Sequence, residues 1–247
     1  MDIKSTDNDI YDPSILIDGC EQLGIHLSRK QVQQFVRYYR MLYEKNQVMN
    51  LTAVIEWKEV QTKHYLDSLL LVRSVDLSEQ LRVMDLGTGA GFPGIPLKIA
   101  FPHLSVLLAD SLKKRILFLN EVIQELELSD IETIHGRAEE LGRQSRYREQ
   151  HDLVVSRAVA NLSSLSEYCL PFVKTGGYFV SYKSADIDEE FRSAGNAIRI
   201  LGGDDPQRMI WPLPCTEMER AFVKIRKKSG TPARYPRKAG TPSRDPL

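Results

Sequence analysis

A glycine-rich loop that follows a short apolar run is the feature that most restricts how this chain can fold. Residues 85–94 read DLGTGAGFPG, with four glycines and one proline in ten positions, directly after Val83 and Met84. A tight turn from a strand into a helix needs one or two glycines, because few of its positions require a positive φ angle. The excess of glycine therefore predicts a ligand that approaches the backbone of this loop.

Two ligand-binding patterns overlap in the loop. The spacing Gly87-x-Gly89-x-Gly91 behind the acidic Asp85 is typical of a site for S-adenosylmethionine. The spacing Gly89-x-Gly91-x-x-Gly94 is the dinucleotide pattern, in which glycines allow a pyrophosphate to reach a helix N-terminus. The loop therefore indicates either a methyltransferase or, as the alternative, a nicotinamide-dependent dehydrogenase.

Charge and proline positions favour the methyl donor. A carboxylate at Asp85 suits the cationic amino group of S-adenosylmethionine, whereas it repels a pyrophosphate. Pro93 and Pro96 fall in the first turn of the following helix, where they offer no N–H to a phosphate. Asp110, at the end of the next strand, fits ribose hydroxyls in either pattern. We therefore expect S-adenosylmethionine as cofactor, bound by the loop glycines, Asp85 and Asp110.

From residue 82 onward, short apolar runs alternate with helical stretches such as residues 113–128. This alternation is typical of βαβ units and a parallel sheet. The last two runs lie too close together to enclose a helix, so we expect an antiparallel pair at the sheet edge. The strands are predicted at residues 82–86, 104–110, 131–135, 152–156, 177–183, 208–213 and 219–227. The predicted fold class is α/β, with a Rossmann-like, seven-stranded and mostly parallel sheet.

The chain before this sheet reads as helical. Ser28 and Gln31 form a capping-box pattern at the start of an amphipathic helix. A second helix is predicted over residues 57–75, where His64 and Asp67 share one face because of their spacing. These two side chains either position RNA or form a polar pair that packs the helix, and both interpretations stay open here.

The length of 247 residues fits one α/β domain with an appendage. We expect an N-terminal helical extension over residues 1–80, the Rossmann-like domain over residues 81–228 and a basic C-terminal tail over residues 229–247. The tail is rich in proline and glycine and has no apolar period.

Charge is balanced overall but not along the chain. Lysine plus arginine and aspartate plus glutamate both number 33, so net charge indicates no partner. The tail carries Arg234, Arg237, Lys238 and Arg244 against only Asp245. Such a segment is either a contact for the RNA backbone or a solvated chain end. Because nothing in it resembles the donor motifs, we expect that the tail, if it helps to hold RNA, does so without shaping the methionine pocket.

The three cysteines, Cys20, Cys169 and Cys215, are odd in number and follow no C-x-x-C pattern. This argues against a disulfide framework or a zinc site, and two of them are expected to be packed. No run approaches the ~20 apolar residues of a membrane span, and residues 1–14 are too acidic and polar for a signal peptide. We expect a monomeric, cytoplasmic protein with no metal and no membrane contact.

Seven short motifs occur in the order that a known family shows. They are NLT at 50–52, HYLDSL at 64–69, DLGTGAGFPGIPL at 85–97, KKRILFL at 113–119, GRAEEL at 136–141, SRAVANL at 156–162 and YPRKAGTP at 235–242. In these motifs the chain resembles the bacterial small-subunit ribosomal RNA methyltransferase G family, formerly called glucose-inhibited division protein B. One departure is Asn161, where many members have proline.

The resemblance implies a class I S-adenosylmethionine-dependent methyltransferase whose partner is small-subunit (16S) ribosomal RNA or the ribosomal subunit. It implies methyl transfer to N7 of one guanosine in the decoding-region loop. Donor-binding positions of the family carry over to Gly87, Phe92, Ala138, Glu139 and Arg157. Glu139 also follows a predicted strand, where a carboxylate can reach the exocyclic amine of adenine.

The sequence agrees with chemistry at N7. This atom has a lone pair and no proton to lose, so the transfer needs alignment more than a general base. Motifs typical of methylation at an exocyclic amine or a pyrimidine carbon are absent after the fourth predicted strand. Arg157 ends that strand and is the predicted catalytic residue, because topology points it into the ligand crevice. A donor-sensing RNA-binding protein without transfer activity, and a phosphate contact from Lys183, stay open as alternatives.

Overall fold

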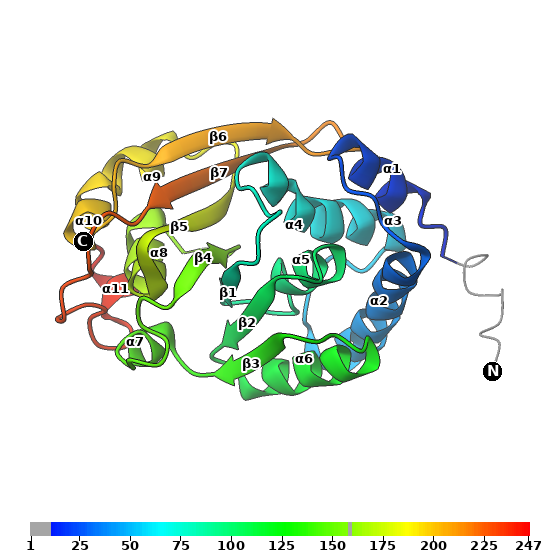
Figure 1. The fold of residues 1–247 in the computed structure, drawn as a ribbon, viewed down its shortest axis with the longest axis horizontal. Helices are drawn as coiled ribbons and strands as arrows, with labels where there is room; N and C mark the ends of the chain where they lie inside the picture. Colours follow the sequence, from blue (N-terminus) through cyan, green and yellow to red (C-terminus); the bar gives the residue numbers. More distant parts are fainter. Residues whose placement is uncertain (1–10, 158–159) are drawn as a thin grey trace.

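The computed structural model describes residues 11–157 and 160–247. The acidic N-terminal stretch through residue 10, and Ala158 and Val159 of the SRAVANL motif, lie outside the described residues. Helices lie on both sides of a central sheet, and the N-terminal helices gather at the end of the molecule away from the C-terminus (Figure 1).

Seven strands form one sheet in the order β3-β2-β1-β4-β5-β7-β6. Their bounds are β1 Arg82–Leu86, β2 Ser105–Asp110, β3 Ile131–His135, β4 His151–Ser156, β5 Val173–Ser184, β6 Gln207–Pro212 and β7 Glu219–Arg226. Strands β1 to β5 are parallel, and β7 runs antiparallel between β5 and β6. The predicted fold class is confirmed. The strand order reverses between β1 and β4, which is where such sheets bind ligands, at the carboxyl ends of the strands.

Two helices open the chain, α1 Ser14–Gln22 and α2 Arg29–Met49. The predicted capping box of α2 is confirmed, because Gln31 N donates to Ser28 Oγ at 3.3 Å and Ser28 N donates to Gln31 Oε1 at 2.8 Å.

The helix predicted over residues 57–75 changes its hydrogen-bond spacing along its length. It comprises α3 Trp57–Val60, a π-helix Gln61–Leu66, α4 Asp67–Leu69 and a 3-10 helix Leu70–Arg73. The Ser68 hydroxyl donates to the carbonyl of His64 at 2.5 Å and competes with backbone N–H groups for it. The predicted helix is confirmed over residues 57–73, and its middle is a π-helix instead of a regular α-helix. Turns of the π type occur frequently at functional sites.

The remaining helices of the described residues are α5 Gly94–Ala100, α6 Lys113–Glu125, α7 Ala138–Leu141, α8 Leu162–Cys169, a 3-10 helix Leu170–Phe172, α9 Asp188–Ser193, α10 Gly195–Ile200 and α11 Thr241–Arg244. One hydrophobic core joins the N-terminal helices to the sheet, and a second core includes residues of α8 and α10.

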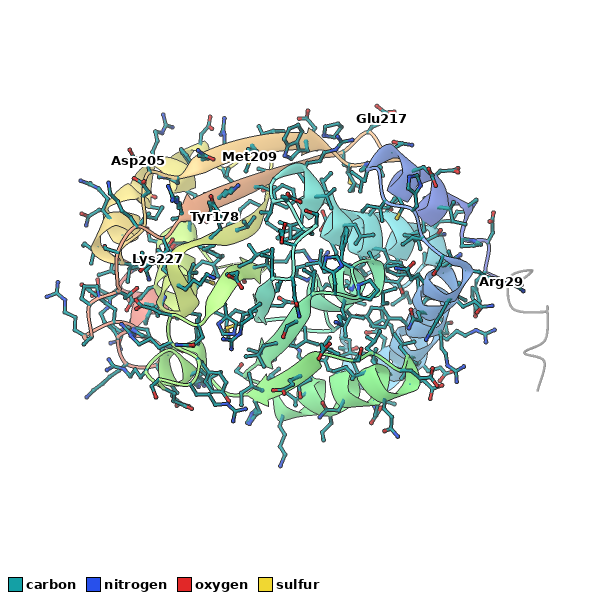
Figure 2. All side chains as sticks on the ribbon, in the orientation of Figure 1. Arg29, Tyr178, Asp205, Met209, Glu217 and Lys227 are labelled. Atoms are coloured by element: carbon teal, nitrogen blue, oxygen red, sulfur yellow. The ribbon has the colours of Figure 1, made fainter. Side chains whose placement is uncertain are left out.

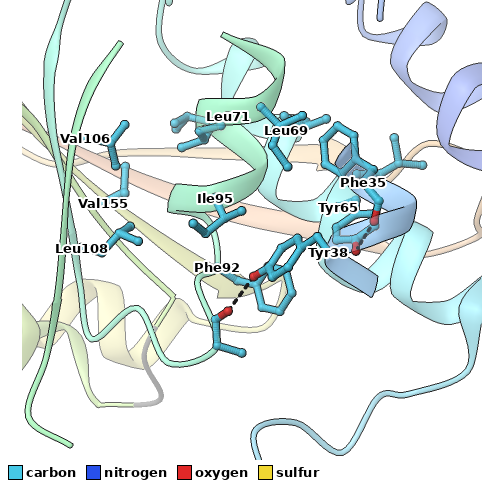
Figure 3. Close-up of a cluster of buried hydrophobic side chains, with 14 of the residues drawn as sticks. Phe35, Tyr38, Tyr65, Leu69, Leu71, Phe92, Ile95, Val106, Leu108 and Val155 are labelled. Atoms are coloured by element: carbon cyan, nitrogen blue, oxygen red, sulfur yellow. Dashed lines mark hydrogen bonds between the residues drawn. The ribbon is translucent and has the colours of Figure 1, made fainter. Parts of the chain in front are cut away.

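The first core fixes the glycine loop from behind. Phe35 and Tyr38 of α2 pack with Tyr65 and Phe92 (Figure 3). The Tyr38 hydroxyl donates to the carbonyl of Ala90 at 2.5 Å, so α2 is tied directly to the loop. The N-terminal helices therefore support the glycine loop as well as packing against the sheet.

All three cysteines are free, and Cys20 and Cys169 are buried as predicted. Burial raises the pKa of the Cys20 thiol to about 12, so this thiol stays protonated. Among the helices of the described residues, none has the length and apolar character needed to cross a membrane. The same residues contain no group of three or more His, Cys, Asp or Glu side chains that could hold a metal ion.

Candidate active site

A pocket of about 250 Å³ opens at the carboxyl ends of the parallel strands. Four predicted donor-binding residues line it, namely Gly87, Asp110, Ala138 and Glu139. It is also lined by residues that were not predicted as contacts, among them Ser111, Gly136, Arg137, Ser156, Leu165 and Tyr168. Ser111, Gly136 and Ser156 directly follow or end a strand, which is the signal that marks them in the sequence, whereas Leu165 and Tyr168 belong to α8. The other predicted residues do not line this pocket: Asp85, Gly89, Gly91, Phe92 and Arg157.

A second cavity, of about 300 Å³, lies at the opposite edge of the sheet. Arg82, Ser105, Asp130 and His151 line it, and it includes none of the predicted site residues. Although this cavity is larger, parallel α/β sheets bind their ligands at the carboxyl ends of the strands. We therefore assign the candidate active site to the smaller pocket.

The glycines of the loop serve different purposes. Gly89 has a φ angle of +63°, and a Cβ built there meets no atom within 4 Å, so this glycine leaves open space. Gly91 has a φ angle of +109°, and a Cβ there lies 2.6 Å from the Tyr38 hydroxyl and 2.7 Å from Ile95. Gly91 therefore allows the loop to pack on α2 and α5, whereas Gly89 leaves room for a ligand.

Asp85 braces the loop from within the sheet. It is fully buried, and its Oδ2 atom accepts hydrogen bonds from Thr88 Oγ1 at 2.6 Å and from Gly94 N at 2.8 Å. Its Oδ1 atom is buried with no hydrogen-bond partner among the described residues. Burial raises the pKa of this carboxyl to about 6, against the opposing effect of the Thr88 hydrogen bond. Thr88, which holds the carboxylate, was not predicted.

Asp110 ends β2 and is held in one orientation. Its Oδ1 atom accepts from Leu112 N at 2.9 Å. Its Oδ2 atom accepts from Gly89 N at 2.9 Å and from the Arg115 guanidinium at 3.2 Å. Three donors therefore fix the carboxylate beside the glycine loop, with its remaining lone pairs available to ligand hydroxyls.

Glu139 connects the pocket to the C-terminal tail. This buried carboxylate accepts a hydrogen bond from Gly240 N at 2.9 Å through Oε1. The Ser164 hydroxyl donates to the carbonyl of Pro242 at 2.6 Å, next to the pocket-lining Leu165. The expectation that the tail does not shape the pocket is therefore wrong, because tertiary packing brings the YPRKAGTP motif against α7 and α8.

The tail is also less free to bind phosphate than its charges suggested. Lys227, labelled in Figure 2, lies just before the tail. It is fully buried and donates to the carbonyl of Leu170 at 2.6 Å. The Arg237 guanidinium binds the buried carboxylate of Glu167 through two nitrogens. Arg237 is therefore already paired within the protein and is less available to RNA phosphates than its sequence suggested, whereas Lys238 is exposed.

Arg157 extends from the end of β4 toward the N-terminal helices. Its NH1 group donates to Asp67 Oδ2 at 2.8 Å and to the carbonyl of Lys63 at 3.1 Å. Its guanidinium lies 5.0 Å from the centre of the Phe92 ring. The predicted catalytic arginine thus sits between the donor loop and the polar helix face, and Phe92 contacts it rather than lining the pocket.

His64 is locked in one tautomer by its two partners. Arg157 NH2 lies 3.2 Å from Nδ1, and arginine only donates, so Nδ1 accepts and the proton is on Nε2. Nε2 then donates to the Thr52 hydroxyl at 2.9 Å. Burial, and then the charge of Arg157, lower the pKa of His64 to about 3. The ring is neutral and stacks on Phe92 with centroids 4.4 Å apart.

Asp67 joins two arginines that lie far apart in the sequence. Its Oδ1 atom accepts from Nε of Arg220, a residue of β7, at 2.6 Å, while Oδ2 accepts from Arg157. No motif marks Arg220 in the sequence, because its place follows from the insertion of β7 beside β5. The polar face of the second helix is therefore a buried network that holds Arg157.

Two other residues of interest are explained by local contacts. Asn161, where many family members have proline, caps α8 by accepting a hydrogen bond from Ser164 N at 3.0 Å. Lys183 is half-buried and donates to the carbonyl of Ala160 at 2.7 Å and to Glu190 at 2.6 Å. Its ammonium is thus already paired within the protein.

Two solved structures share this fold at low sequence identity. Pyrococcus horikoshii TYW2 in complex with MeSAdo matches with a TM-score of 0.52 and 13% identity, over 67% of this chain and 63% of that chain. Aeropyrum pernix fibrillarin with bound S-adenosyl-L-methionine matches with a TM-score of 0.50 and 14% identity, over 64% of this chain and 72% of that chain. These likenesses support the class I, Rossmann-like architecture.

Comparison of sequences identifies the family. The family model described as rRNA small subunit methyltransferase G matches residues 31–208. The ribosomal RNA small subunit methyltransferase G of Lachnoclostridium phytofermentans is 52% identical over 96% of this chain and 98% of that protein. The corresponding protein of Alkaliphilus metalliredigens is 51% identical over 94% of this chain and 98% of its own. The chain therefore belongs to the ribosomal RNA small subunit methyltransferase G family.

Proposed function

We propose that this chain transfers a methyl group from S-adenosylmethionine to N7 of one guanosine in the decoding-region loop of bacterial 16S ribosomal RNA. Family membership supports methylation of small-subunit ribosomal RNA and argues against a dehydrogenase. N7 and the decoding region are the finer part of the proposal, and they rest on the resemblance of the motifs and on the chemistry of the site. When bound, S-adenosylmethionine supplies a methyl group activated by its sulfonium sulfur.

The residues around the pocket fit this cofactor. The buried Oδ1 atom of Asp85 has no hydrogen-bond partner among the described residues, as expected where a ligand or a water donates to it. The open space at Gly89 allows close approach to the backbone. We assign Asp110 to the ribose hydroxyls, Glu139 and the Ala138 backbone to adenine, and the backbone of the glycine loop to the methionine part.

The observation that carries the choice of N7 is the state of His64. Its two ring nitrogens are both hydrogen-bonded, and its lowered pKa of about 3 leaves it neutral. An imidazole held in this way positions a neighbour instead of accepting a proton. Guanine N7 has a lone pair and no proton to lose, so it needs no general base. It therefore fits a site whose histidine already uses both ring nitrogens in hydrogen bonds within the protein.

We assign the contact with guanine to Arg157. Three hydrogen bonds hold its guanidinium, which leaves two of its five N–H groups for a ligand. These groups suit the O6 edge of guanine, or the donor carboxylate together with an RNA phosphate. Arg157 aligns the base with the methyl group, and alignment is what this transfer needs.

The remaining parts of the proposal concern the organisation of the chain and its setting. We propose a monomeric, cytoplasmic enzyme with residues 1–80 as the helical extension, residues 81–228 as the methyltransferase domain and residues 229–247 as the C-terminal part. The exposed cations of the last part suit contact with RNA.

The decisive experiment is methyl transfer followed by mapping. Isolated small subunits and deproteinised 16S RNA, both lacking the modification, are incubated with labelled S-adenosylmethionine, and the nucleosides and fragments are analysed by mass spectrometry. We expect 7-methylguanosine in one fragment of the decoding region. Label in another nucleoside would overturn the N7 assignment, and donor binding without any transfer would favour the donor-sensing alternative.

A further inference from the structure

The C-terminal segment, residues 229–247, lies against the part of the donor pocket that Glu139 lines. Gly240 N donates to Glu139 Oε1 at 2.9 Å. Within the described residues, the second carboxylate oxygen, Oε2, accepts no hydrogen bond and is left for a ligand. A backbone N–H that binds one oxygen of a carboxylate fixes the direction in which the other oxygen points.

A buried ion pair anchors the segment just before Gly240. The Glu167 side chain is 1% exposed and accepts from Arg237 N at 2.7 Å and from Arg237 NH2 at 2.7 Å. Charge-assisted pairs with two parallel hydrogen bonds are the most directional contacts that side chains make. Glu167 belongs to α8, so this helix determines the position of the chain on the N-terminal side of Gly240.

A second anchor follows Gly240. The Ser164 hydroxyl of α8 donates to the carbonyl of Pro242 at 2.6 Å, and α11 lies beside α8 (Figure 1). Gly240 is therefore held from both sides by one helix, and that helix also provides Leu165 and Tyr168 to the pocket wall.

We propose that α8 holds the C-terminal segment as a fixed wall of the donor pocket, and that Glu167 and Arg237 are positioning residues that set Glu139 for the exocyclic amine of adenine. The inference rests on the proposed donor site. It goes beyond that site in giving the tail a role in recognition of the cofactor, where the charge pattern suggested only RNA contact. Loss of the anchor is expected to release Gly240, and with it the fixed direction of the Glu139 carboxylate.

The test compares two ligands that differ only at the adenine amine. These are S-adenosylhomocysteine and its purine analogue, which has hydrogen in place of the amine, each titrated by calorimetry. One hydrogen bond to a charged group distinguishes the two ligands, so the wild-type protein should prefer the adenine form by about tenfold. Glu139→Gln should reduce this preference, and Glu167→Gln should reduce it to a similar extent.

Asp245→Asn is the matched control, because Asp245 is an exposed carboxylate that also faces Arg237, at 3.6 Å. This variant should keep the wild-type preference. If Glu167→Gln does not fold, Ser164→Ala replaces it in the test, because it removes only the second anchor. Ser164→Ala should reduce the preference for the adenine ligand by a smaller factor than Glu139→Gln. A folded Glu167→Gln protein with the full preference would overturn the role of the tail. A wild-type protein that binds both ligands equally would overturn the contact between Glu139 and the adenine amine, and the inference with it. A wild-type protein that binds neither ligand would overturn the donor site itself.

Discussion

The carboxylate of Asp67 and the guanidinium of Arg157 meet at 2.8 Å, although 90 positions separate the two residues in the chain. The same carboxylate accepts from Arg220 at 2.6 Å and is 3% exposed. One buried carboxylate thus pairs with two arginines. These hydrogen bonds connect the helical N-terminal part to the end of β4 and to β7. They hold Arg157 beside Phe92 of the glycine loop.

Asp67→Asn should lower the free energy of unfolding by about 3 kcal/mol, because removal of one member of a buried ion pair leaves the remaining charge without its partner. Urea unfolding measures the effect. The control is Asp188→Asn, since Asp188 pairs with Arg208 at the surface and is 65% exposed. This exposed pair should contribute at most ~1 kcal/mol. Equal midpoints for the wild type and Asp67→Asn would contradict a stabilising role for the network.

The sheet was predictable because each buried strand is a short apolar run in the sequence, and these runs alternate with helical stretches. The ends of β1 and β2 carry Asp85 and Asp110, whose positions follow from the same pattern. Contacts between distant segments were not predictable in this way. Gly240 donates to Glu139, a residue 101 positions away in the chain. In the sequence, Arg237 cannot be distinguished from a solvated cation, because its partner Glu167 lies on α8 and is brought to it only by the fold. Tertiary packing, not local charge, decides such pairs.

Gly89 and Gly91 offer a contrast between binding and folding. Gly89→Val should abolish binding of S-adenosylmethionine in calorimetry, because the side chain enters the open space beside the loop. The protein should stay folded at reduced stability, because a β-branched residue is strained at a φ angle of +63°. Gly91→Ala should chiefly lower stability, since its Cβ would lie 2.6 Å from the Tyr38 hydroxyl at a φ angle of +109°. Overpacking of this kind costs about 1–3 kcal/mol. Near-native donor affinity in folded Gly89→Val would remove the ligand from this loop.

His64 should make stability depend on pH in the acid range. Its pKa in the folded protein is about 3, below the ordinary value of 6.5, so the unfolded chain binds more protons between these values. Stability from this residue is therefore present above pH 6.5 and decreases as the pH falls toward 3, by up to ~1.4 kcal/mol per pH unit. Asp85, whose pKa is raised to about 6, acts in the opposite direction between pH 3.8 and 6.

The contribution of His64 is isolated by comparing the wild type with His64→Gln in urea unfolding at several pH values. The wild type should lose more stability than the variant between pH 6.5 and 5. Parallel curves for the two proteins would mean that the imidazole is not held neutral by its surroundings.

The rate of methyl transfer should vary little between pH 7 and 9, because guanine N7 has no proton to remove and His64 is already neutral in this range. Single-turnover assays with saturating RNA measure the chemical step. A steep rise of the rate with pH, at constant RNA affinity, would indicate a general base at the site and would contradict attack by N7.

Lys238 and Arg244 are exposed cations of the tail, whereas Arg237 is held by Glu167. Lys238→Ala combined with Arg244→Ala should weaken RNA binding and reduce the slope of log affinity against log salt. The reduction should reach ~0.9 for each duplex phosphate that the protein no longer neutralises, or ~0.7 for each phosphate of a single strand. Donor affinity should be unchanged, because neither side chain belongs to the anchor on α8.

Filter binding over a series of salt concentrations gives the slope. An unchanged slope with unchanged affinity would make these residues part of a solvated surface, while the role of Gly240 at Glu139 would stand independently.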